Sequence, residues 1–172
     1  MTDRQLLAPA FPDDTGAVDP AVGAALEAYG AGTARYVDAL AALQHSRVLV
    51  PVVAVLGEVE VDEAGLAHDK SSDMAAVLMT GADGRLALLG FTGTERLTAW
   101  DPQARPVPVT MQAATAAAVQ EDAAALVLDL VGPVTFVIEG DDLRALASGW
   151  TLARIGDEIA WVAPAEDPDA RG

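Results

Sequence analysis

Apolar residues in the first third of the chain recur at helical spacing before they merge into one continuous run. Asp19 followed by Pro20 predicts a helix start, because aspartate caps free N–H groups and proline is tolerated in the first turn. Gly30 and Gly32 predict a break in that helix. Beyond it, apolar residues three and four positions apart predict a second helix with one face against a sheet: Tyr36, Val37, Leu40 and Leu43.

The run RVLVPVVAVL, residues 47–56, is the strongest strand pattern in the chain. It is dense in β-branched residues and apolar on both faces. Pro51 lies inside it and cannot donate to a ladder, which predicts an edge strand or a bulge. Farther on, DMAAVLMT and RLALLGFT flank GADG, whose Asp83-Gly84 pair suits the positive φ angles of a tight turn. We therefore expect a hairpin here.

The segment after this hairpin predicts a short capped helix. Thr92 precedes Glu95 by three residues, the spacing of a capping box, and Leu97 and Trp100 follow one turn apart on the inward side. An alternative use of FTGTE is weak anion binding at the helix start, although the segment lacks the lysine and glycine spacing of a P-loop.

The rest of the chain alternates short strands with short helices. ARPVPVTM predicts a strand limited by its prolines, ALVLDL and VTFVIE predict two more, and WTLARI with EIAWVA predicts a final hairpin. GDDLRALASG predicts a helix with an aspartate cap at its start and Gly149 at its end. An alanine-rich helix between these strands should bury one side, formed by Met111, Ala114, Thr115, Ala118 and Val119.

This order of elements predicts an α+β fold with a mixed, mainly antiparallel sheet covered by helices. A chain of 172 residues fits one domain. We expect that domain over residues 19–163, with flexible tails at 1–18 and 164–172, which are rich in Pro, Asp and Ala and lack periodicity.

Composition excludes several classes of function. A net charge of -16 disfavours nucleic acid and anionic membranes as partners, because both are bound through clustered Lys and Arg. No apolar run approaches the roughly 20 residues of a spanning helix, and no signal peptide is recognisable, so we expect a cytoplasmic protein. The chain has no cysteine, which excludes disulfides, thiolate metal sites and cysteine nucleophiles. The single lysine among ten basic residues favours a GC-rich genome such as that of an actinobacterium.

Candidate nucleophiles in the sequence lack their usual partners. Lys70 precedes Ser71 and Ser72, whereas serine-lysine hydrolases place lysine three residues after serine, so we expect a loop that enters a strand. His45, Ser46 and Asp38 could form a triad, but adjacent strand residues point to opposite faces. We expect His45 to be a surface histidine.

Candidate metal ligands are scattered along the chain. His45 and His68 are far apart, and neither has a second histidine at helical spacing. Glu58, Glu60 and Asp62 alternate in a way that could hold a hard cation or protect an exposed strand edge from aggregation. We favour edge protection, and we expect no metal and no cofactor.

Several short motifs in a fixed order resemble the SseB N-terminal-like family. They are LVPVV, KSSDMA, GADGRLALLGFTGTERLTAW and RPVPV, and the resemblance spans residues 46–149. This chain differs at Gly93, where the family more often has serine, and at VGP near Gly132, where NP is more usual. The resemblance supplies no established catalytic residue. A shared surface, if the family has one, would involve the polar and aromatic members of these motifs: Lys70, Asp73, Phe91, Thr92 and Trp100. The alternative for Phe91 and Trp100 is core packing.

These observations favour a noncatalytic binding or protein-interaction module with an unidentified protein partner. The phenotype behind the family name supplies the alternative, an amino-acid-related sensor or an enzyme linked to serine metabolism. A third hypothesis is a homodimer formed through a sheet edge or an apolar face, since the composition leaves little polar surface.

Overall fold

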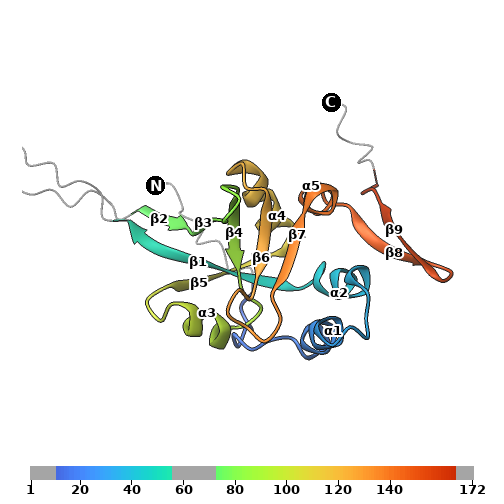
Figure 1. Ribbon diagram of the computed structural model, residues 1–172, viewed down its shortest axis with the longest axis horizontal. Coiled ribbons are helices and arrows are strands. Elements are labelled where there is room, and N and C mark those ends of the chain that lie inside the picture. The colour runs from blue at the N-terminus through green and yellow to red at the C-terminus, as the bar shows by residue number, and fades with distance from the viewer. Residues whose placement is uncertain (1–10, 56–72, 166–172) are drawn as a thin grey trace, which may run out of the picture.

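The computed structural model describes residues 11–55 and 73–165, and these form an α+β fold (Figure 1). Its helices are α1 (Pro20–Gly30), α2 (Tyr36–Leu43), α3 (Thr94–Trp100), α4 (Met111–Gln120) and α5 (Gly140–Ala147). Its strands are β1 (Arg47–Val55), β2 (Asp73–Ala76), β3 (Leu78–Thr80), β4 (Leu86–Gly90), β5 (Arg105–Thr110), β6 (Ala125–Leu128), β7 (Phe136–Glu139), β8 (Thr151–Ile155) and β9 (Glu158–Val162). Within the described residues, no helix has the length and apolar character needed to cross a bilayer.

The strands pair mainly antiparallel, as the sequence predicts. One sheet has the order β2-β1-β5, a second has the order β3-β4-β6-β7, and β8 pairs with β9 in a separate hairpin. Only β4 and β6 among these pairs are parallel. Leu49 in β1 exchanges two backbone hydrogen bonds with Phe91, at 2.8 and 2.9 Å, so the first two sheets are joined. The predicted mixed sheet is therefore built from two connected parts.

Pro51 lies in the centre of a sheet, which corrects its assignment to an edge strand or a bulge. β1 is flanked by β2 on one side and β5 on the other, and Pro51 is opposite Pro106 of β5. On its other side, the Pro51 carbonyl accepts a hydrogen bond from Val77 N, while the Val77 carbonyl accepts one from Leu89 N. Because Pro51 has no N–H to offer, the Val77 carbonyl is free to turn to β4. At Val77 the chain passes from β2 of one sheet to β3 of the other.

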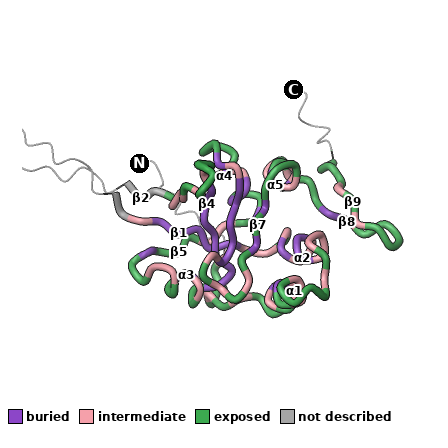
Figure 2. The backbone as a smooth tube through the Cα atoms, viewed as in Figure 1, coloured by how far each residue is buried: buried purple, intermediate pink, exposed green. Residues whose placement is uncertain are grey.

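Both faces of the joined sheet are covered. On one face, α1, α2, α4 and α5 pack on alternate strand residues such as Leu88 and Leu126. On the other face, α3 covers Leu89, Phe91 and their neighbours. The buried stretches of β4 and β6 run through the middle of the molecule (Figure 2).

Three local predictions need correction. Only Gly84 of the Asp83-Gly84 pair has positive φ, at 80°. Val119 is 42% exposed, whereas the other four residues predicted for the inner side of α4 are buried. The N-cap of α5 is Glu139, which makes no side-chain capping bond, in place of the expected aspartate. The predicted cap of α1 is confirmed, because Asp19 accepts from Ala21 N and Val22 N.

The β8–β9 hairpin extends away from the sheet layers (Figure 1). The Gln44 side chain at the end of α2 holds it, accepting from Leu152 N at 2.6 Å and donating to Leu152 O at 2.9 Å. Trp161 Nε1 also donates to Asp142 at 3.0 Å. The hairpin is therefore attached chiefly at its base.

Candidate functional site

The carboxyl ends of the parallel strands β4 and β6 meet at one edge of the sheet. Thr92 follows β4 by two residues, and Asp129 follows β6 directly. Asp129 N donates to Gly90 O at 3.0 Å, and its backbone has a φ of 54°, a conformation that aspartate tolerates better than most residues. In open sheets with parallel strands, ligand sites tend to form outside such carboxyl ends.

Three side chains form a buried polar network at this edge. Thr92 donates twice to the Asp129 carboxylate, from its backbone N at 2.8 Å and from its hydroxyl at 2.7 Å. Arg96 Nη1 donates to Thr92 Oγ1 at 2.9 Å and also to Asp129. Asp129 is fully buried, and within the described residues no buried side-chain nitrogen or oxygen lacks a partner. The hydrogen-bonding groups of this network satisfy one another, so the network holds the two strand ends together. A ligand would have to bind to the residues around it.

This network corrects the predicted capping box at Thr92. The N-cap of α3 is Gly93, which makes no side-chain capping bond, and the Thr92 hydroxyl turns to Asp129 instead. Asp129 and Arg96 are residues of this sheet edge that the sequence analysis missed. Asp129 lies within ALVLDL, which was assigned wholly to a strand, and nothing in that pattern marks the turn of its backbone.

Arg47, the first residue of β1, connects this edge to residues 11–18, which we call the N-terminal strap. Its Nε donates to Asp14 at 2.6 Å, its Nη2 to Ala17 O at 2.8 Å and its Nη1 to Thr92 O at 2.6 Å. The side chains of Arg47 and Asp14 are only 12% and 16% exposed. The hydrogen bond from Arg47 lowers the pKa of Asp14, an effect that burial opposes and the Gly16 N–H supports.

Two glycines allow the strap to approach the start of α3. Gly16 has a φ of 77°, and its carbonyl accepts from Thr94 N at 2.7 Å. A Cβ on Gly93 would lie 2.6 Å from Val18 Cγ2 and 3.3 Å from Val18 N. Residues 11–18, which the sequence placed in a flexible tail, therefore make specific contacts with the sheet edge.

A pocket of about 440 Å³ lies between the strap and the sheet edge, and we call it the strap pocket. Its lining includes Phe11, Asp13 and Asp14 from the strap, and His45, Arg47 and Thr92 from the body. A smaller cavity of about 230 Å³ shares His45 and is bordered by Gln44 and Trp150. Charged and aromatic groups around a concavity of this size can bind a small molecule or the side chains of a partner.

The predicted surface residues do not form one exposed patch. Phe91 is fully buried, and its ring centroid lies 5.6 Å from that of the half-buried Trp100, which agrees with core packing. Thr92 is buried in the polar network and is one of the residues that line the strap pocket. Asp73 begins β2, its side chain is not described, and Lys70 lies outside the described residues.

The other candidate sites are not assembled in the described part of the chain. His45 is exposed, as expected, while Ser46 Oγ donates to Leu43 O at 2.7 Å and Asp38 pairs with Arg35 at 2.8 Å. Among residues 11–55 and 73–165, no group of three or more potential ligands is positioned for a metal. The remaining candidates lie outside the described residues: Glu58, Glu60, Asp62, His68, Ser71 and Ser72.

Comparison with known families gives one match. The model of the SseB protein N-terminal domain matches residues 22–145. Neither the curated proteins nor the solved structures give a significant match. The matched range includes Arg47, Thr92, Arg96 and Asp129 but begins after the strap.

Proposed function

This chain belongs to the SseB N-terminal domain family, and from that premise we propose that it is a noncatalytic binding or protein-interaction module whose recognition surface is the strap pocket. The observation that carries the proposal is the position of this pocket of about 440 Å³, directly beside the carboxyl end of β4. A site of this kind is supported by a rigid sheet edge and shaped by a loop-like segment, the usual construction of a recognition surface.

Charge supports a protein as the partner. With a net charge of -16, the chain would repel a nucleic acid backbone, which is uniformly negative, whereas a protein partner can offer groups of either sign. Asp13 and His45 are exposed in the strap pocket and available for such contacts. Rim charges of this type mainly set the rate and specificity of association.

Capture of a partner by the purified, immobilised protein tests the proposal. We expect Asp13→Asn and His45→Ala to reduce recovery of a specific partner several-fold while the protein stays folded. Asp157→Asn at the tip of the β8–β9 hairpin is the matched control, because it removes the same charge away from the strap pocket. Equal capture by all variants, or catalytic turnover by the purified chain, would overturn the proposal.

The volume of the strap pocket also favours a second candidate, a small-molecule sensor or enzyme for amino-acid-related compounds. About 440 Å³ lies within the usual range of roughly 300–1,000 Å³ for small-molecule sites. Titration with the common amino acids by calorimetry distinguishes the two functions. Heats that saturate and depend on His45 would favour the sensor or enzyme, and flat titrations would remove it.

A further inference from the structure

The N-terminal strap lies outside the family match, whereas the groups it contacts lie inside it. The match begins at residue 22, and the contacted groups belong to Arg47 and Thr94. The matched domain therefore presents the guanidinium of Arg47 and the backbone N–H of Thr94 to the segment that lies over them. In this chain that segment is residues 11–18.

We infer that this surface, the strap groove formed by Arg47 and Thr94, is a binding site for an extended acidic peptide of a partner protein, and that the strap occupies it in cis. The inference goes beyond the proposed function, because a peptide bound here would displace the strap, whose Phe11, Asp13 and Asp14 line the strap pocket. It also makes the strap a competitor that lowers the affinity for that partner.

The contacts of the strap define the motif that the groove accepts. The guanidinium of Arg47 binds a carboxylate, here that of Asp14. Thr94 N donates to the carbonyl two residues later, that of Gly16, and Arg47 Nη2 donates to the carbonyl three residues later, that of Ala17. The positive φ at the second of these positions, with Thr94 directly against it, favours glycine there. The preferred motif is an aspartate followed by any residue, glycine and a small residue.

The strap is attached in a way that would allow a peptide from a partner to take its place in the groove. Residues 12–15 lie at the surface, with only the Asp14 side chain turned inward to Arg47, and the strap pocket of about 440 Å³ separates part of the strap from the body. Val18 packs against the core at the end of the strap, so local opening would involve residues 12–17, which the hydrogen bonds of Asp14, Gly16 and Ala17 hold. Because the strap is tethered, its effective concentration is high, and weakening it should raise the apparent affinity for a peptide in trans.

Binding of a labelled synthetic peptide, acetyl-PDDTGAV-amide, to the full-length chain tests the inference. We expect weak binding to the unmodified protein and at least tenfold tighter binding to Asp14→Ala, in which the strap loses its carboxylate. Asp157→Ala, at the tip of the β8–β9 hairpin, should bind like the unmodified protein. A peptide with asparagine in place of its second aspartate should lose at least tenfold in affinity, and Arg47→Met should bind neither peptide. Circular dichroism confirms that each variant is folded.

Two results would overturn the inference. One is a folded Asp14→Ala variant that binds the peptide no more tightly than the unmodified protein, and the other is binding that ignores the aspartate-to-asparagine change. Either result would leave the proposed function standing if partner capture still depended on Asp13 and His45. Conversely, aspartate-dependent peptide binding together with capture that is insensitive to those two residues would remove the strap pocket as the recognition surface and retain the groove.

Discussion

Asp129 and Thr92 join the ends of two parallel strands through a pair of hydrogen bonds to one carboxylate. The backbone N and the hydroxyl of Thr92 donate to different oxygens of Asp129, at 2.8 and 2.7 Å. Arg96, whose side chain is 17% exposed, supplies the opposite charge to a carboxylate that is fully buried. Because the partners come from segments 37 and 33 residues apart, the network fixes how β4 and α3 lie against β6.

Replacing Asp129 should destabilise the protein severely. In Asp129→Asn, the buried ion pair is broken and an amide N–H₂ replaces one acceptor, so the free energy of unfolding should fall by about 3–5 kcal/mol. Urea denaturation at neutral pH measures this change. Asp122→Asn is a matched control, since Asp122 also has positive φ, at 53°, but is exposed. Its effect should stay within about 0.5 kcal/mol. A loss below about 1 kcal/mol for Asp129→Asn would show that the network is not important for stability.

A methyl group should have opposite effects at two glycines that lie near Val18. Gly93→Ala places a Cβ 2.6 Å from Val18 Cγ2, and overpacking of this kind costs about 1–3 kcal/mol. Gly23→Ala, inside α1, places a Cβ at an ordinary 3.6 Å from Val18 Cγ1 and should stabilise by about 0.5–1 kcal/mol through helix propensity. Thermal unfolding of the two variants measures whether each substitution stabilises or destabilises the protein. Stabilisation by Gly93→Ala would contradict the close contact between the strap and α3.

Local patterns predict most elements of this fold but not the partners of its polar groups. The strands, the helices and the N-cap of α1 depend on neighbouring residues, and the sequence predicts them. Pro51 was misplaced because its tolerance in a central strand depends on Val77, whose carbonyl bonds Leu89 instead. Likewise, the Thr92 hydroxyl had a local capping role available, and the distant Asp129 competes successfully for it. Tertiary contacts decide which partner each of these polar groups takes, and the spacing of residues along the chain does not predict those contacts.

The stability contributed by Asp14 should depend on acid pH. Hydrogen bonding to Arg47 lowers its folded-state pKa below the usual 3.8, so the contribution is fully present above the unfolded-state pKa and is lost as pH falls through the folded-state value. The difference in free energy of unfolding between the unmodified protein and Asp14→Asn should therefore be constant from pH 7 to about pH 5 and shrink below about pH 4. Urea denaturation across this range measures it.

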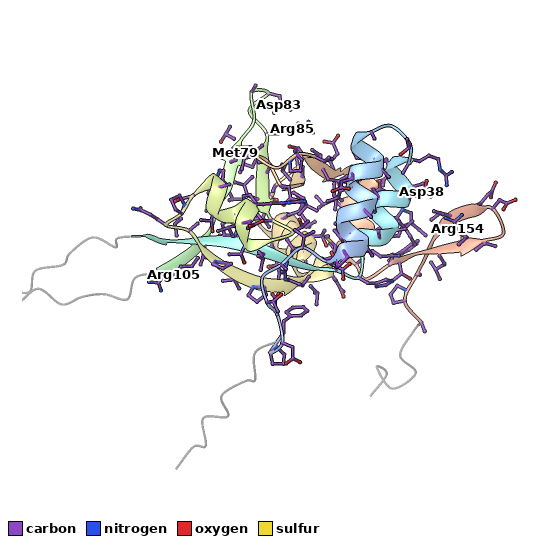
Figure 3. The ribbon with its side chains drawn as sticks, turned by 90° about the horizontal axis from the view of Figure 1, so that it is seen from below. Asp38, Met79, Asp83, Arg85, Arg105 and Arg154 are labelled. Atoms are coloured by element: carbon purple, nitrogen blue, oxygen red, sulfur yellow. The ribbon has the colours of Figure 1, made fainter. Side chains whose placement is uncertain are left out.

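Asp83→Asn is the control for this pH dependence. Asp83 also pairs with an arginine, Arg85, at the tip of the β3–β4 hairpin (Figure 3). Its side chain and that of Arg85 are 52% and 60% exposed, so solvent screens the pair and its removal should leave the free energy of unfolding nearly unchanged. If Asp14→Asn and Asp83→Asn gave equally small effects at pH 7, the Arg47 contact would not hold the strap.

Removal of the Gln44 carboxamide should free the β8–β9 hairpin while the rest of the fold stays intact. In Gln44→Met, Leu152 N and O lose partners at 2.6 and 2.9 Å, whereas the side-chain volume is nearly kept. An isolated hairpin is marginally stable, and the exposed Arg154–Asp38 pair at 3.5 Å (Figure 3) adds little to its attachment. Hydrogen exchange at Leu152 N should accelerate at least tenfold, with the exchange rates of β4 and β6 unchanged.

Gln120→Met at the exposed end of α4 is the control and should leave all exchange rates unaltered. Unchanged exchange at Leu152 in Gln44→Met would mean that Trp161 and its bond to Asp142 hold the hairpin alone.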